Sequence, residues 1–470
     1  MCQGAAAGFL PNLYQAASAA FLLVMYTLAI DLKPRSTCMA PGRANVESNA
    51  RLRATTAHVD ASPSSTQANS RIAAAIAMIH LPHRSTPNPR TESPMKTMHL
   101  LIALLFCLAP AAQAAECKDT SGYAKARAII EDLNRIVAPN GIQESYATRI
   151  GGVDQWISVR GQDKANPIVL FAHGGPAAPL IPAMWQYQRP LEEYFTVVNW
   201  DQRGAGKTFA SHDPSAYADT LKIDRYADDA IEIAEYVRKR YGKRKLILMG
   251  HSWGTVVAMS AALKRPDLFY AYVGIGQVIN VRENERISFE FGLQQAKARG
   301  NTEAVKEMET IAPYPGDQPI TRERIITARK WAQYYGGMTA YRNESPYYFR
   351  APLLSPEYDD CDRAGVDRGN EFSLGRILPE FLDVDFSKVK AFAIPVVMFM
   401  GRHDYTTPSQ PTADWLARTQ APFKQGVWFE NSSHMIMWEE PGKTLVSLLQ
   451  YVRPLTDEAK AETKRPSGAD

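Results

Sequence analysis

The fold is decided by residues 245–264, which read KLILMGHSWGTVVAMSAALK. Lys245 to Gly250 is an apolar run of strand length, Thr255 to Lys264 continues as a helix, and the pattern G-x-S-x-G lies between them. A serine in such a turn is lifted clear of the backbone, and the helix N-terminus offers N–H dipoles to a developing oxyanion. We therefore predict that Ser252 is a nucleophile, with a plain glycine-bounded turn as the alternative.

Apolar strands and helices alternate on both sides of this stretch, which is typical of an α/β fold with a mostly parallel sheet flanked by helices. The predicted strands are 167–172, 195–200, 245–250, 271–275, 394–400 and 426–429, and the predicted helices are 223–241, 255–264 and 443–452. Between about 281 and 386 the alternation lapses into charged amphipathic helices and an aromatic-rich stretch. This insertion predicts a helical cap over the carboxyl edge of the sheet, where ligands of open α/β sheets bind.

A nucleophilic serine needs a base, and the base needs an orienting acid. Asp404 follows the predicted strand 394–400, and His434 follows the last predicted strand. Ser252, Asp404 and His434 thus stand in the order nucleophile, acid, base, each after a strand. Singly, Asp404 is also suited to cap a helix and His434 to a surface loop, but we expect the three to form a catalytic triad.

The motif His173-Gly-Gly-Pro176 follows strand 167–172, and its glycines let backbone N–H groups approach a bound oxygen. We assign the oxyanion hole to the backbone amides of Trp253 and Gly175; a tight strand-to-helix turn is the alternative. The stretch from Asp201 to Thr208, DQRGAGKT, lacks the glycine spacing of a phosphate-binding loop, so we expect it to support the site structurally.

The charge distribution excludes a nucleic-acid-binding surface as the main feature of the chain. The formal net charge is +4, but residues 1–114 hold 9 Lys and Arg against 4 Asp and Glu, which leaves 44 basic and 45 acidic residues in the remainder. The five cysteines form neither a CxxC motif nor a Cys/His cluster at metal-ligand spacing. We expect no metal, no other cofactor and no nucleic-acid partner.

A secretory signal is expected at residues 95–114, where one early lysine precedes an apolar run and the small-x-small pattern Ala112-Gln-Ala114. Residues 1–94 are then expected to be an extension that is either non-native or disordered. The alternative, a membrane anchor at 16–30, is shorter than a spanning helix requires. We expect a secreted or periplasmic mature chain from Ala115 without a stable membrane span.

Together, five motifs resemble those of the proline iminopeptidase branch of the α/β-hydrolases. They are His173-Gly-Gly-Pro176, Asp201-Gln-Arg-Gly-Ala-Gly206, Gly250-His-Ser-Trp-Gly254, Gly401-Arg-His-Asp404 and Ser433-His434. The resemblance covers about Ile150 to Tyr451 and implies an α/β-hydrolase fold with an inserted helical cap, a Ser/Asp/His triad and no cofactor. The sequence departs from the family pattern HGGPG at its fifth position, which is Ala177.

The resemblance also implies that cap carboxylates hold the free amino terminus of the substrate. The candidates are Glu283, Glu285 and Glu290. A solvated helix face interleaved with Arg282 and Arg286 is the alternative interpretation.

The leading functional hypothesis is a secreted aminopeptidase of proline iminopeptidase type that releases an N-terminal residue from short peptides through an acyl-enzyme. The alternatives are an esterase or amidase acting on small molecules with the same triad, and a catalytically weak binding or sensing module. Epoxide hydrolases are disfavoured because they need a carboxylate nucleophile where this chain has Ser252. The predicted division is the extension 1–94, the signal peptide 95–114, the hydrolase core 115–280 and 387–455, the cap 281–386 and a polar tail 456–470.

Overall fold

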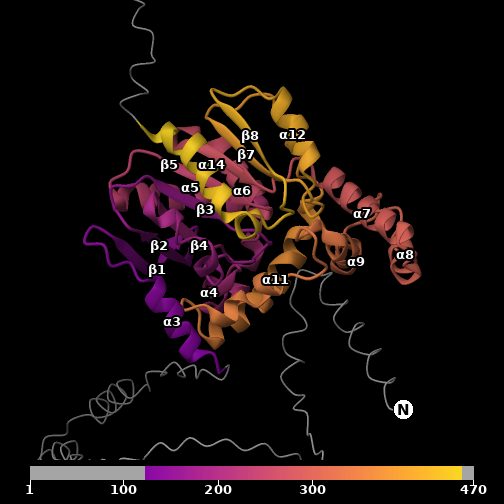
Figure 1. Ribbon diagram of the computed structural model, residues 1–470, viewed down its shortest axis with the longest axis horizontal. Helices are drawn as coiled ribbons and strands as arrows, with labels where there is room; N and C mark the ends of the chain where they lie inside the picture. The colour runs from indigo at the N-terminus through magenta and orange to yellow at the C-terminus, as the bar shows by residue number, and fades with distance from the viewer. Residues whose placement is uncertain (1–121, 458–470) are drawn as a thin grey trace, which may run out of the picture. The chain divides into compact units, whose positions relative to one another are not determined.

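Eight strands form a single sheet in residues 122–457, the part of the chain that the computed structural model describes (Figure 1). Their order is β1-β2-β4-β3-β5-β6-β7-β8. The pairs β1–β2 and β2–β4 are antiparallel, and all other neighbours are parallel. The strands are β1 (Ile142–Ile150), β2 (Val153–Gly161), β3 (Ile168–Ala172), β4 (Thr196–Asp201), β5 (Leu246–His251), β6 (Phe269–Ile275), β7 (Val396–Gly401) and β8 (Lys424–Phe429).

The six strands and three helices predicted from sequence are confirmed, with ends that differ by at most two residues. The antiparallel strands β1 and β2 are not among the predicted strands. In β1 exposed and partly buried residues alternate between two buried ends, and its polar sequence IQESYATRI lacks the apolar run that marks β3 and β5. An edge strand with one solvated face therefore escapes a search for continuous apolar segments.

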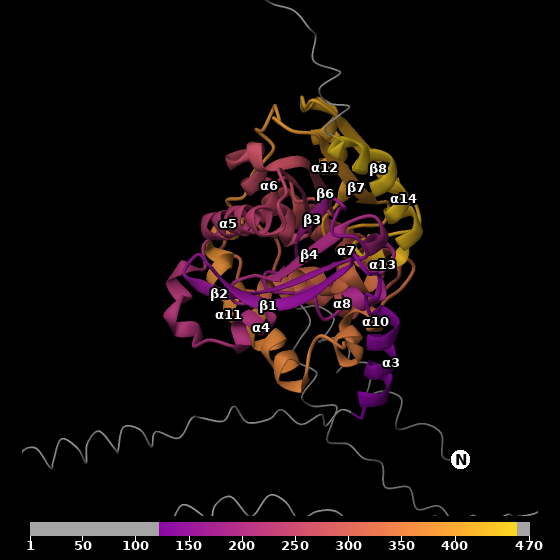
Figure 2. The same cartoon turned by 90° about the vertical axis from the view of Figure 1, so that its left-hand side faces the viewer.

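The two faces of the sheet bury separate hydrophobic clusters. In β5, Leu246 and Leu248 belong to the cluster that includes α5 (Ile223–Tyr241) and α6 (Trp253–Lys264). Ile247 and Met249 belong to the opposite cluster, which includes Leu448 of α14 (Pro441–Tyr451). Figure 2 shows α5 and α6 on one side of the strands and α14 on the other. Successive side chains of β5 point to opposite faces of the sheet, and both faces are buried, which explains why β5 is apolar throughout.

The predicted cap region contains five α-helices between β6 and β7. They are α7 (Val281–Ala298), α8 (Thr302–Glu309), α9 (Arg322–Ala332), α10 (Pro346–Phe349) and α11 (Asp360–Phe381). The last of these helices packs on α4 (Gly206–Ala210), where a Cβ on Gly369 would lie 2.5 Å from the carbonyl oxygen of Gly204. Small residues therefore let α11 approach the hydrolase core closely.

Several predictions concern residues outside the described range. The extension 1–94, the signal peptide 95–114, Ala115 and most of the polar tail all fall there, as does Cys117. Cys361 is disulfide-bonded. Among residues 122–457, no helix has both the length and the hydropathy needed to cross a bilayer.

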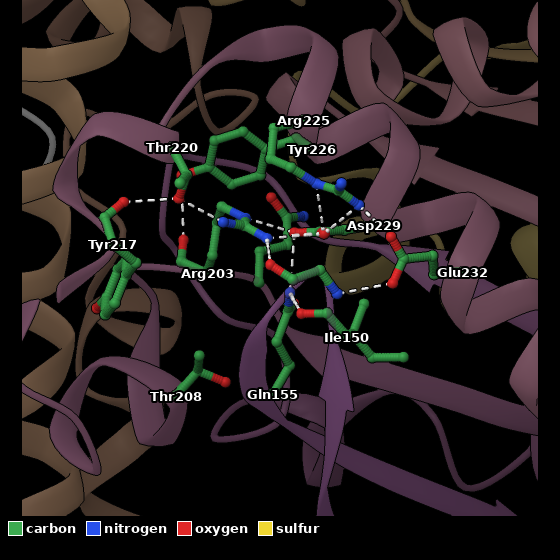
Figure 3. A network of polar contacts seen from close by, with 12 residues as sticks. Ile150, Gln155, Arg203, Thr208, Tyr217, Thr220, Arg225, Tyr226, Asp229 and Glu232 are labelled. Carbon is green, nitrogen blue, oxygen red and sulfur yellow. Dashed lines mark hydrogen bonds and ion pairs between the residues drawn. The ribbon is translucent and has the colours of Figure 1, made fainter.

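A buried ion pair ties the loop after β4 to the rest of the core (Figure 3). Arg203 and Asp229 have fully buried side chains, and Arg203 donates two hydrogen bonds to the Asp229 carboxylate, at 2.5 and 2.8 Å. Arg203 also donates to the carbonyl of Gly151 in the β1–β2 turn, and Gln155 Nε2 donates to Asp229 at 2.8 Å. The pair thus joins the β1–β2 hairpin, the DQRGAG loop and α5, as expected for a loop with a structural role.

Replacing Asp229 by Asn should lower the free energy of unfolding by about 3–5 kcal/mol, because the Arg203 charge would remain buried without its counter-ion. The matched control is Asp228→Asn, whose carboxylate is 42% exposed and pairs with Lys264 on the surface. That change should cost at most about 1 kcal/mol. Urea unfolding of both variants tests this, and equal losses would contradict the assigned role of the pair.

Candidate active site

Ser252 lies in a tight turn between β5 and α6 with φ of 55° and ψ of −125°. A positive φ is unfavourable for a residue with a Cβ, so the surrounding contacts must hold this conformation. The flanking glycines make these contacts possible. A Cβ on Gly250 would lie 2.6 Å from the carbonyl oxygen of Gly254, and a Cβ on Gly254 would overlap the carbonyl oxygen of Ala172. The G-x-S-x-G pattern therefore reflects the close approach of α6 to β3 and β5.

Asp404 and His434 form a buried hydrogen-bonded pair. His434 Nδ1 lies 2.9 Å from Asp404 Oδ2, and both residues are only 3% exposed. The backbone N–H groups of Thr406 and Thr407 donate to Asp404 Oδ1 at 2.9 and 2.8 Å, and the Thr407 hydroxyl donates to Oδ2 at 3.0 Å. With Nδ1–H donating to the carboxylate, a neutral His434 presents Nε2 as a proton acceptor.

Ser252 and His434 approach each other around the end of β6. The Ser252 N–H donates to the carbonyl of Ile275 at 3.0 Å, and a Cβ on Gly276 would lie 3.0 Å from His434 Nδ1. The ring of His251, which precedes the serine, lies 4.7 Å from the His434 ring between centroids. No hydrogen bond joins the Ser252 hydroxyl to His434 among the described contacts, a looseness common in sites without substrate.

Two further histidines near the serine are held neutral. Burial lowers the pKa of His251 to about 3, with a contribution from His434, and lowers the pKa of His173 to about 4. The Gln202 N–H donates to His173 Nε2 at 3.1 Å, so Nδ1 carries the proton that His173 donates to the Gly174 carbonyl. Both rings therefore act as uncharged structural groups around Ser252.

The predicted oxyanion donors, Gly175 and Trp253, lie on the two chain segments that meet at the serine. A Cβ on Gly174 would lie 3.2 Å from the Ser252 Cβ, and Trp253 is the first residue of α6. In residues 122–457, neither the Gly175 nor the Trp253 backbone N–H has a hydrogen-bond acceptor. Ala177 has φ of 57°, a conformation that glycine adopts more readily.

The cap contacts the three loops that carry Asp404, His434 and Pro176. Gly337 O accepts from the Thr406 N–H and hydroxyl, both at 2.9 Å, and Met338 O accepts from the His434 N–H at 3.0 Å. On α11, Asn370 Nδ2 donates to the carbonyl of Pro176 at 2.6 Å. Sequence reasoning missed these anchors, because most of them use backbone carbonyls that any residue carries.

The three predicted cap carboxylates do not come together with the triad. Glu285 is completely buried and bound by Arg329 and by the Tyr314 hydroxyl, which donates at 2.8 Å. Glu290 pairs with Arg286 on the exposed face of α7, and Glu283 is exposed in its first turn. No hydrogen bond or ion pair in the described chain links them to Ser252. Glu285 thus already has a counter-ion and the other two carboxylates are solvated, and their role toward a substrate stays a prediction.

Sequence reasoning did not single out another cap carboxylate, Asp367 of α11. Within residues 122–457 it has no hydrogen bond or ion pair, and burial raises its pKa to about 8. Its neighbours Val366 and Asn370 line a cavity of about 50 Å³ together with Ala177 of the oxyanion loop. Nothing in the sequence distinguishes Asp367 from the other acids of this helix, because its isolation arises only from packing.

The geometry has counterparts in known proteins. A family profile described as "alpha/beta hydrolase fold" matches residues 167–441. The chain is 31% identical over 310 residues to "Probable aminopeptidase YbaC" of Bacillus subtilis (strain 168), covering 65% of this chain and 94% of that protein. It is 24% identical over 322 residues to the proline iminopeptidase of Saccharolobus solfataricus, covering 66% and 92%. The crystal structure of the Mycobacterium smegmatis proline iminopeptidase aligns with a TM-score of 0.48 at 18% identity, covering 67% of this chain and 100% of that chain.

The buried neutral histidines predict acid sensitivity of the fold. Between the ordinary histidine pKa of 6.5 and the folded value of about 4, His173 binds a proton in the unfolded chain only, so stability falls as the pH drops through this range. The stability difference between wild type and His173→Asn should therefore change by about 1.4 kcal/mol per pH unit in this window. Urea unfolding at pH 4 to 7 measures it, and parallel pH profiles would refute the assignment.

Proposed function

Because the chain belongs to the α/β-hydrolase fold family it is a hydrolase, and we propose that it is a serine aminopeptidase of proline iminopeptidase type. It would release the N-terminal residue of short peptides through an acyl-enzyme. One observation carries the proposal: Ser252 is held in a strained turn beside two unbonded N–H groups and a buried Asp404–His434 pair. The names of the curated relatives, an aminopeptidase and a proline iminopeptidase, support this choice of substrate.

The proposed mechanism follows the placement of these groups. His434 Nε2 takes the proton of the Ser252 hydroxyl while Oγ attacks the carbonyl carbon of the first peptide bond. The N–H groups of Trp253 and Gly175 stabilise the oxyanion, and His434 gives its proton to the leaving amine as the C–N bond breaks. Water then hydrolyses the ester in the same way. Asp404 orients His434 and stabilises its protonated form.

Recognition of a free amino terminus is assigned to Asp367. It is an unpaired, largely buried carboxylate of the cap, on the helix whose Asn370 holds the oxyanion loop. A substrate ammonium placed beside it would favour the ionised carboxylate and supply the cation that this residue lacks. An ester or amide without a free amine would gain nothing from Asp367.

The proposed location is outside the cytoplasm, in the periplasm or the medium. Its support is the signal-like sequence at residues 95–114 and its small-x-small pattern at Ala112-Gln-Ala114.

Ser252→Ala should lower kcat/KM by several orders of magnitude, on the scale of the ~10⁶ loss typical of triad knock-outs, and leave the fold intact. Turnover of proline and alanine arylamides and of short-chain aryl esters measures this loss, and circular dichroism monitors the fold. Activity within about tenfold of the wild type would exclude Ser252 as the nucleophile.

Asp367→Asn should reduce the preference for a free-amine prolyl substrate over its N-acetylated form by a factor of ~10 to 100, since it removes a charge-assisted contact of about 1.5–3 kcal/mol. Glu371→Gln, which changes an exposed acid of the same helix, is the control and should leave the ratio unchanged. If the wild type accepts both substrates equally, the esterase or amidase alternative replaces the aminopeptidase. If the wild type prefers the free amine and Asp367→Asn leaves that preference unchanged, only the assignment of Asp367 is rejected.

A further inference from the structure

A cavity of about 610 Å³ lies next to the segment that carries His434 and has no part in the mechanism above. Three parts of the chain line it. They are the cap, with Ala340 to Arg342 and Tyr347; the residues on both sides of His434, with Asn431, Met437, Trp438, Glu439 and Pro441; and Gln186 from the segment after the oxyanion loop. Its volume is within the range of roughly 300–1,000 Å³ usual for small-molecule sites.

Wall residues of the cavity contact the loop that carries His434 and the ring of His251. Glu439 in its wall accepts the N–H of Ser433, which precedes the catalytic histidine, at 2.8 Å. The same carboxylate accepts the N–H of Ala340 at 2.6 Å. The ring of Trp438, another wall residue, lies 6.3 Å from the His251 ring between centroids. These contacts place the cavity next to the loop that carries the proposed base.

Arg342 is an exposed arginine that brings a positive charge to the cavity, and this charge partly offsets the rise that burial causes in the pKa of Glu439. In the described part of the chain its guanidinium has no hydrogen bond or ion pair, and it lies 5.3 Å from the centre of the Tyr347 ring. Glu439 is the one carboxylate among the lining residues, and each of its oxygens already accepts a backbone N–H. A planar guanidinium that lies over an aromatic ring and makes no hydrogen-bonded ion pair is suited to bind a carboxylate.

We propose that this cavity receives the leaving-group part of the peptide and that Arg342 binds its C-terminal carboxylate. This inference rests on the proposed aminopeptidase function and narrows its substrate class to dipeptides and other very short peptides. Asp367 and Arg342 would then hold the two ends of one substrate, with the scissile bond at Ser252 between them. The leaving group, a free amino acid or short peptide, would carry the carboxylate that Arg342 recognises.

The test compares prolyl-alanine with prolyl-alanine amide, which differ only in the terminal charge. The wild type should prefer the free carboxylate by ~10-fold or more in kcat/KM, as a charge-assisted contact allows. In Arg342→Gln the ratio should fall to about one, while turnover of the amide and of proline arylamide stays near the wild-type level. Arg342→Lys should retain part of the preference, since it keeps the charge without the planar fork.

Arg286→Gln is the matched control, because it removes a cap arginine that is paired with Glu290 on the surface of α7. It should leave the ratio unchanged. This inference would be overturned if the wild type turned over both peptides equally well, or if Arg342→Gln kept the full preference for the free carboxylate. In either case, turnover of proline arylamide would still support the proposed function. Absence of turnover of every free-amine substrate would reject the proposed function and this inference with it.

Discussion

The close packing of α6 against β3 and β5 is the constraint on which the site depends. It forces Ser252 into a positive φ, and three hydrogen bonds hold this conformation. The Ser252 N–H donates to the Ile275 carbonyl, and the N–H and the hydroxyl of Thr255 donate to the Ser252 carbonyl at 2.8 and 2.6 Å. The same packing directs the first N–H of α6 toward the reacting centre. The conformation of the nucleophile and one proposed oxyanion donor thus have a common origin.

The cap has a second role besides covering the sheet. Its segment around Gly337 and Met338 holds the loops of Asp404 and His434, and α11 holds the oxyanion loop through Asn370. A displacement of the cap would therefore alter the catalytic geometry as well as the substrate cavity. This coupling links specificity to turnover, because the groups proposed to bind the two ends of the substrate belong to the same cap.

Burial leaves charged side chains in the core either paired or neutral. Arg203 and Asp229 neutralise each other beneath the sheet edge, whereas His173 and His251 lose their charge altogether. Asp201, also buried, accepts the N–H of Lys207 at 2.8 Å, and burial raises its pKa to about 7. Arg342, by contrast, makes no hydrogen-bonded ion pair with a carboxylate among residues 122–457, and its guanidinium can bind one.

The amino-acid sequence by itself determined the α/β fold, the elbow at Ser252, and the positions of Asp404 and His434 after strands. These features depend on local signals, namely apolar runs of strand length, helical periodicity and glycines where backbones meet. Only the tertiary structure decided that Asp367 is partly buried without a partner. Glu285 and Asp367 look alike in the sequence, but packing gives one an arginine partner and leaves the other without a counter-ion. Charge compensation depends on neighbours that are distant along the chain, so no local pattern reveals it.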